Sequence, residues 1–144
     1  MEKYQIVTEN DIKIGMTGEF CKEVIKENIE QFAKITGDEN PMHMDNNFAK
    51  TTQFGKRIAH GMFSASLISA VIGMKIPGPG AIYLGQSLNF KAPVYFGDVL
   101  VAKATVVKIS QKANFKIVTL DTVVTNQDGV IVTDGQAKVI PVKK

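Results

Sequence analysis

The spacing of hydrophobic residues changes from helical to alternating about halfway along the chain. Before that change, Phe20 and Val24 share one face of an alternating stretch, which predicts a strand over residues 18–27. The next segment has hydrophobic residues close to helical spacing at Ile29, Phe32, Ala33 and Ile35. Asn28 is a candidate N-cap and Gly37 a candidate stop, so we expect a short helix between them.

The segment HGMFSASLISAVIGMKI, residues 60–76, is apolar nearly all the way round a helical wheel and is interrupted only by small residues. A helix that is apolar on all sides is normally buried on all sides. Its apolar part is shorter than the roughly 18–20 residues that a membrane span needs. We therefore predict a long central helix inside the core. Pro41 stops the preceding helix from continuing, so residues 38–55 are expected to form an overhanging loop with short turns.

Alternating patterns follow from Ala81 onward and predict strands over residues 81–94 and 98–110 and two further runs. Those runs are joined at residues 126–129, NQDG, a hairpin signal with glycine placed for positive φ. With residues 18–27 this gives an α+β fold. We expect an antiparallel five-stranded sheet wrapped round one long buried helix, in a single domain over residues 1–144. Such a sheet leaves edges and apolar surface exposed, so pairing with a second copy is expected.

Composition narrows the class of protein. The 144 residues are 44% hydrophobic and 22% charged, as in a globular protein, and the net charge of +3 comes from scattered lysines. A nucleic-acid-binding protein more often shows a concentrated basic stripe with aromatic residues, so nucleic acid is not expected as a partner. Cys21 is the only cysteine and the first residues contain no hydrophobic leader. These features favour a cytoplasmic protein without a membrane partner.

The stretch TGDENPMHMD, residues 36–45, carries the candidate chemistry. Asp38 and His43 can share one water, with one residue taking a proton and the other delivering one. Asn40 can hydrogen-bond the local backbone and Pro41 stiffens the loop. The loop leads to the start of the predicted central helix, where free amide groups stabilise negative charge. The alternative is a plain polar loop in which Asp38 caps a turn and His43 faces solvent.

The stretch FAKITGDENPMHMDNNFA resembles the signature of the MaoC-like hydratase family, especially its (R)-specific enoyl-CoA hydratases. That signature has an aromatic residue, a small residue, G-D-x-N-P-aliphatic-H, and a small residue six positions after the histidine. The matching residues here are Phe32, Thr36, Gly37, Asp38, Asn40, Pro41, Met42, His43 and Ala49. Met42 is the one visible departure, because the signature usually has Leu, Ile or Val there. Residues 54–98 also look like the family's central helix and following strand.

The resemblance implies a hotdog fold, a homodimer and reversible syn addition of water to a trans-2-enoyl-CoA, giving the (R)-3-hydroxyacyl-CoA. Coenzyme A is then part of the substrate, and no cofactor is expected. Carried over to this sequence, Asp38 is the general base, while His43 hydrogen-bonds the water and helps to move the proton. The backbone N–H of Gly61 would bind the oxyanion. Ser69 matches a helix position that faces the site in relatives, although a simple packing role fits it equally well.

Other polar residues have both a functional and a structural interpretation. Lys56 and Arg57 could meet the phosphates of coenzyme A, although a solvated basic pair is the commoner outcome. His60 directly precedes Gly61, and we expect it to cap or pack the helix start rather than act in catalysis. Asp45 is expected to cap the turn that follows it. No group of residues has the sequence spacing of a metal site, so no metal is expected.

The sequence leaves alternatives open. Within the same fold, the substrate could be carried on an acyl carrier protein, which would make the chain a (3R)-hydroxyacyl-acyl-carrier-protein dehydratase of fatty-acid synthesis. The third hypothesis is a hotdog acyl-CoA thioesterase, and the fourth is a non-catalytic acyl-CoA-binding subunit. Acyl-chain length and pathway, whether polyester (polyhydroxyalkanoate) synthesis, β-oxidation or butyrate formation, are not readable. Since Asp38 and His43 both lie in a predicted loop, we expect their replacement to leave folding little affected.

Overall fold

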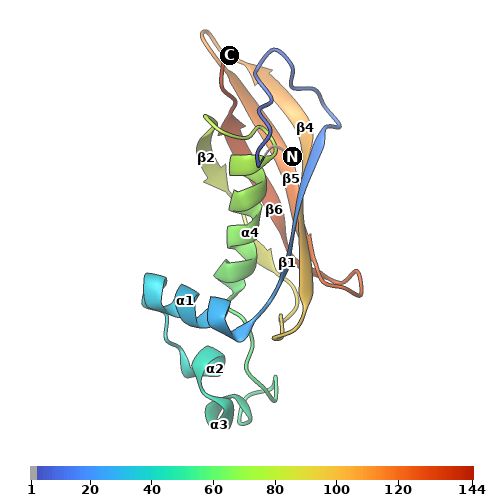
Figure 1. Ribbon diagram of the computed structural model, residues 1–144. Helices are drawn as coiled ribbons and strands as arrows, with labels where there is room; N and C mark the ends of the chain where they lie inside the picture. Colours follow the sequence, from blue (N-terminus) through green and yellow to red (C-terminus); the bar gives the residue numbers. More distant parts are fainter. Residues whose placement is uncertain (1–2) are drawn as a thin grey trace.

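One antiparallel sheet runs along a single long helix, and three shorter helices gather at one end of that helix (Figure 1). The structure is a computed structural model that describes residues 3–144. Its elements, in chain order, are β1 (Thr17–Glu23), α1 (Lys26–Thr36), α2 (Pro41–Met44), α3 (Asn46–Ala49), α4 (Gly61–Met74), β2 (Ile82–Gln86), β3 (Asn89–Phe90), β4 (Val99–Gln111), β5 (Lys116–Thr125) and β6 (Ile131–Ile140).

The sheet has six strands in the order β1-β4-β5-β6-β2, with β3 also paired to β6. The expectation of five strands was wrong because the predicted strand over residues 81–94 is interrupted after Gln86. The backbone just after β2 comes so close to β6 there that a Cβ added at Gly135 would lie 1.8 Å from the carbonyl oxygen of Ser87. The hairpin at residues 126–129 is confirmed, with Gly129 at a φ of 75°.

The core lies between α4 and the inner face of the sheet. The side of α4 that is buried against β1, β4, β5 and β6 carries Phe63, Leu67, Ile68, Val71 and Ile72. Helix α4 is not buried on every side, however. Met62, Ser66, Ser69 and Gly73 lie on an exposed stripe, because the sheet of one chain covers only part of the helix surface. The prediction of a fully buried helix was therefore wrong for a single chain.

Helix α1 differs from its prediction at both the N-terminus and one face. It begins at Lys26, with Ile25 rather than Asn28 at the N-cap position. Ile29 and Ala33 are buried, whereas Ile35 is 85% exposed, because a helical period of 3.6 residues turns it away from that face. The stop at Gly37 is confirmed: its φ is 83° and its N–H donates to the carbonyl of Ala33 over 2.8 Å.

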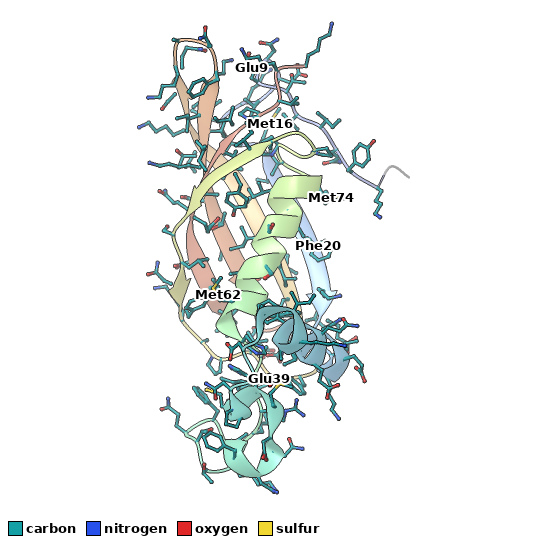
Figure 2. All side chains as sticks on the ribbon, turned by 90° about the vertical axis from the view of Figure 1, so that its left-hand side faces the viewer. Glu9, Met16, Phe20, Glu39, Met62 and Met74 are labelled. Atoms are coloured by element: carbon teal, nitrogen blue, oxygen red, sulfur yellow. The ribbon has the colours of Figure 1, made fainter. Side chains whose placement is uncertain are left out.

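The two ends of α4 have different surroundings. Figure 2 shows Met62 and Met74 near opposite ends of the helix, with Glu39 beside the end that carries Met62. Helices α1, α2 and α3 lie at this same end, away from the chain termini (Figure 1). Between residues 3 and 144, no helix is long and apolar enough to cross a membrane.

Candidate active site

The loop that carries Asp38 is held by a series of short-range hydrogen bonds. Thr36 Oγ1 accepts from the Asp38 N–H at 3.1 Å, and the Asp38 carboxylate accepts from the Asn40 N–H at 3.2 Å. Asn40 Oδ1 then accepts from the Met42 N–H at 3.1 Å, and Pro41 opens the single turn of α2. Asn40 and Pro41 therefore brace the loop as the sequence predicted, because the Asn40 side chain fixes the backbone two residues onward and the Pro41 ring fixes its own φ.

Asp45 belongs to the next turn and not to the site. Its carboxylate caps α3, accepting hydrogen bonds from the N–H groups of Asn47 at 2.8 Å and Phe48 at 3.2 Å. The expectation that Asp45 caps a turn is confirmed.

His43 is buried, with 7% of its surface exposed, so the alternative of a solvent-facing loop histidine is wrong. Its Nδ1 lies 2.8 Å from the carbonyl oxygen of Ile58. A carbonyl can only accept, so Nδ1 carries the hydrogen, and the neutral ring keeps a free lone pair on Nε2. Burial lowers the pKa of His43 below its ordinary value of 6.5; the Ile58 hydrogen bond acts in the opposite direction, and His60 lowers the pKa further.

Arg57 lies inside the loop rather than on the surface. Its Nε donates to the backbone carbonyl of His43 over 2.6 Å, its guanidinium lies over the ring of Phe96, and 8% of the residue is exposed. This placement contradicts a solvated basic pair and removes Arg57 as a candidate for the phosphates of coenzyme A. Lys56 remains exposed, with Nζ 4.5 Å from the centre of the Tyr95 ring, and its phosphate contact stays a prediction.

His60 lies directly beside both candidate catalytic residues, which its sequence position did not reveal. Its Nε2 is 2.8 Å from the carbonyl oxygen of Asp38. Its ring centre is 4.0 Å from that of His43 and 4.9 Å from that of Phe32. His60 occupies the N-cap position of α4 but forms no side-chain cap, so of the two expected roles only packing is confirmed.

A cavity of about 480 Å³ opens beside these residues. Its wall is polar at Asp38, His43, His60 and Gly61, and mainly apolar elsewhere, for example at Phe54, Phe90 and Val132. Gly61 is the first residue of α4, so its N–H has no intrahelical acceptor. A Cβ at Gly61 would lie 2.8 Å from Cδ1 of Phe90, so only glycine allows that ring its present position.

One serine of α4 lines the cavity, but it is not the serine that the resemblance suggested. Ser69, the position suggested by resemblance, is exposed and does not line the cavity. Ser64 lines it instead: it is 1% exposed, and its Oγ has no hydrogen-bond partner within residues 3–144. The periodicity of the helix could have indicated Ser64, because it lies one turn after His60 and Gly61.

Asp38, His43 and His60 each offer a ligand-type atom, and these atoms lie within 4.8 Å of one another. A single water can hydrogen-bond two groups at such a separation, so the cluster can bind a water and transfer its proton. Binding of a metal fits less well. The two imidazole rings are stacked with a tilt of 33°, and stacked rings direct their lone pairs side by side rather than toward one ion.

The chain is similar to known proteins over most of its length. The family described as MaoC like domain matches residues 3–128. An (R)-specific enoyl-CoA hydratase of Rhodospirillum rubrum is 45% identical over 130 residues, which are 90% of this chain and 88% of that protein. A mitochondrial 3-hydroxyacyl-acyl-carrier-protein dehydratase of Solanum lycopersicum is 37% identical over 90% of this chain and 78% of that protein. The solved R-hydratase PhaJ1 of Pseudomonas aeruginosa superposes with a TM-score of 0.89 at 39% identity, over 98% of this chain and 89% of the other.

Proposed function

The chain belongs to the MaoC-like domain family, and on that premise we propose that it is an (R)-specific enoyl-CoA hydratase. The reaction is the reversible syn addition of water to a trans-2-enoyl-CoA, giving the (R)-3-hydroxyacyl-CoA. One observation carries the proposal. The carboxylate of Asp38 and a ring nitrogen of His43 lie within 4.8 Å of each other on the wall of a largely apolar cavity.

The water-activating step uses Asp38 and His43. A water held between the carboxylate and His43 Nε2 attacks C3 of the enoyl thioester, and Asp38 takes the proton that the water loses. The lowered pKa of His43 keeps its ring neutral near pH 7, so Nε2 can accept a hydrogen bond from that water. Water and proton source lie on one face of the substrate, so hydroxyl and hydrogen add on the same side.

The negative charge that forms during the attack moves to the thioester oxygen. We assign the N–H of Gly61, the first residue of α4, as the donor to that oxygen, because it has no intrahelical acceptor and the positive end of the helix dipole lies behind it. When the proton returns to C2, by way of His43 or the Asp38 carboxyl group, the enolate collapses and both groups regain their starting states. The reaction needs no cofactor, since coenzyme A is part of the substrate.

The carrier of the acyl group is the main alternative. Similarity to the tomato dehydratase supports a second candidate function, in which the same site dehydrates a (3R)-hydroxyacyl group on an acyl carrier protein. The higher identity to the Rhodospirillum hydratase favours coenzyme A.

The decisive experiment measures initial rates on crotonyl-CoA and on crotonyl-acyl carrier protein by loss of the enoyl-thioester absorbance. We expect faster turnover of crotonyl-CoA, and a product that an (R)-specific 3-hydroxyacyl-CoA dehydrogenase oxidises while an (S)-specific one does not. Preference for the carrier-protein thioester would establish the second function. Release of free thiol would indicate a thioesterase, and binding without turnover a non-catalytic subunit.

We also propose that two copies of the chain form a homodimer. Two features support it: the exposed stripe of α4, and the edge strand β2, on which Ile82, Tyr83 and Leu84 are exposed. Light scattering coupled to gel filtration tests this, with a monomer at micromolar concentration as the contrary result.

A cytoplasmic location is proposed as well, supported by the single free cysteine, Cys21.

A further inference from the structure

We propose that His60 is a positioning residue that fixes the relative placement of Asp38 and His43, an inference that rests on the proposed hydration of an enoyl thioester. His60 is 17 residues from His43 in sequence, yet it contacts both members of the pair. It acts through them rather than on the substrate, because only 2% of its surface is exposed and its Nδ1 is buried.

The first contact fixes Asp38. Asp38 is exposed and lies in a loop, and its local hydrogen bonds reach only from Thr36 to Asn40. The bond from His60 Nε2 to the Asp38 carbonyl is the one that ties this residue to the start of α4. It connects the general base to the helix that carries the Gly61 amide. Without it, the carboxylate and the oxyanion donor would lie on separately moving segments.

The second contact fixes the ring of His43. The His60 ring packs against the rings of both Phe32 and His43, with centre-to-centre distances of 4.9 and 4.0 Å. The His43 ring is therefore held by its Nδ1–H bond to Ile58 at one edge and by the His60 ring on one face. Two constraints in different directions determine where Nε2 points.

The hydrogen bonds also assign opposite tautomers to the two imidazoles. His43 donates from Nδ1 and His60 donates from Nε2, because each partner is a backbone carbonyl that only accepts. The charged and titratable groups around the stacked rings are the Asp38 carboxylate, the Arg57 guanidinium and, on the cavity wall, Lys91. Only the Asp38 carboxylate among them can accept a hydrogen bond, and His60 Nδ1 has no hydrogen-bond partner within residues 3–144.

Two amide substitutions of different length separate this role from simple packing. In His60→Gln the side-chain nitrogen is the same number of bonds from Cα as His60 Nε2, so it can still donate to the Asp38 carbonyl. The planar amide can also lie against the His43 ring. In His60→Asn the same amide is one methylene shorter and occupies the place of Nδ1, from which it cannot reach that carbonyl. Lys34→Ala, at an exposed position of α1, is the control for surface changes near the site.

We expect His60→Asn to lower kcat on crotonyl-CoA by about 10- to 100-fold, since a misplacement of about 1 Å costs up to that much. KM should change by less than about threefold, because only 2% of the His60 surface is exposed, and His60→Gln should keep kcat within about fivefold of the unmodified protein. Equal loss in the Gln and Asn variants, or unchanged kcat in His60→Asn, would overturn the proposal.

A second measurement does not depend on activity. The chain has only two histidines, so long-range ¹H–¹⁵N NMR spectra contain just two imidazole patterns, and the His60→Gln spectrum assigns the one from His43. At neutral pH we expect an Nδ1–H tautomer for His43 and an Nε2–H tautomer for His60. An Nδ1–H tautomer for His60 contradicts the positioning contact. If both tautomers are as expected but the protein does not hydrate crotonyl-CoA, the proposed function is refuted. The contact between His60 and Asp38 is then still supported.

Discussion

The Nε atom of Arg57 donates a hydrogen bond to the backbone carbonyl oxygen of His43 over 2.6 Å. In return, the His43 ring donates to the carbonyl of Ile58, the residue after Arg57. Residues 57–60 and the loop of residues 38–43 thus bind each other reciprocally, and the His60 bond to Asp38 closes the other end. The catalytic geometry that we propose depends on this pairing of the two segments.

Replacement of Arg57 should therefore destabilise the fold. Arg57→Met keeps an apolar stem against Phe96 but removes the donor to the His43 carbonyl, a hydrogen bond from a charged group worth about 1.5–3 kcal/mol. We expect a loss of that size in the free energy of unfolding, measured by urea denaturation. Lys56→Met, one residue earlier and exposed, should cost no more than about 1 kcal/mol. Similar losses in both variants would contradict the assigned contact.

Asp38→Asn and His43→Asn should each lower kcat by about two to four orders of magnitude, the usual size for a positioned acid or base. The asparagine amide at position 43 can occupy the place of Nδ1 and still donate to Ile58, so the loop should stay folded while Nε2 is lost. Steady-state rates on crotonyl-CoA test this. If either variant kept a rate near that of the unmodified chain, the assigned roles would be wrong.

His43→Ala should differ from His43→Asn in stability. We first expected changes in this loop to leave folding little affected, but His43 is buried and its ring donates to the Ile58 carbonyl. Alanine leaves that acceptor unpaired, at a cost of about 1–3 kcal/mol. Urea denaturation of the two variants, compared side by side, measures the difference, and equal stabilities would show that the Ile58 contact contributes nothing.

Stability should depend on pH through His43. Burial holds its pKa in the folded state below 6.5, so the unfolded chain binds the proton more readily between the two pKa values. The free energy of unfolding should therefore fall as the pH drops through 6.5 toward the folded-state pKa. Denaturation at about pH 7.5 and about pH 5.5 tests this, with His43→Asn as control. A decrease of the same size in the control would assign the effect to other groups.

The oxyanion role of Gly61 can be separated from its small size. Ala and Pro at this position both place a Cβ against Phe90, but only Pro lacks the N–H. Proline suits the first turn of a helix, and His60, with φ −60° and ψ 138°, has the backbone conformation that precedes proline. We expect kcat of Gly61→Pro to be about 10²- to 10³-fold below that of Gly61→Ala. Equal rates would exclude this amide as the donor.

Much of the fold could be predicted from local patterns. Strand alternation located β1, β4, β5 and β6, because one face of each strand is more buried than the other and the residue types therefore alternate with a period of two. Prediction failed where a tertiary contact replaced a local signal. The edge segment breaks after Gln86 opposite Gly135, and local spacing does not encode that contact.

Within the candidate site, short-range chemistry was readable and long-range contact was not. The turn-forming roles of Asn40 and Asp45 act over two or three residues, and both were predicted from side-chain type. The sequence by itself therefore determined the candidate pair, Asp38 and His43, and the turns that separate them. Only the tertiary structure decided that Arg57 and His60 hold that pair, because those contacts span 14 and 22 residues and arise when α4 packs against the sheet and brings the two loops together.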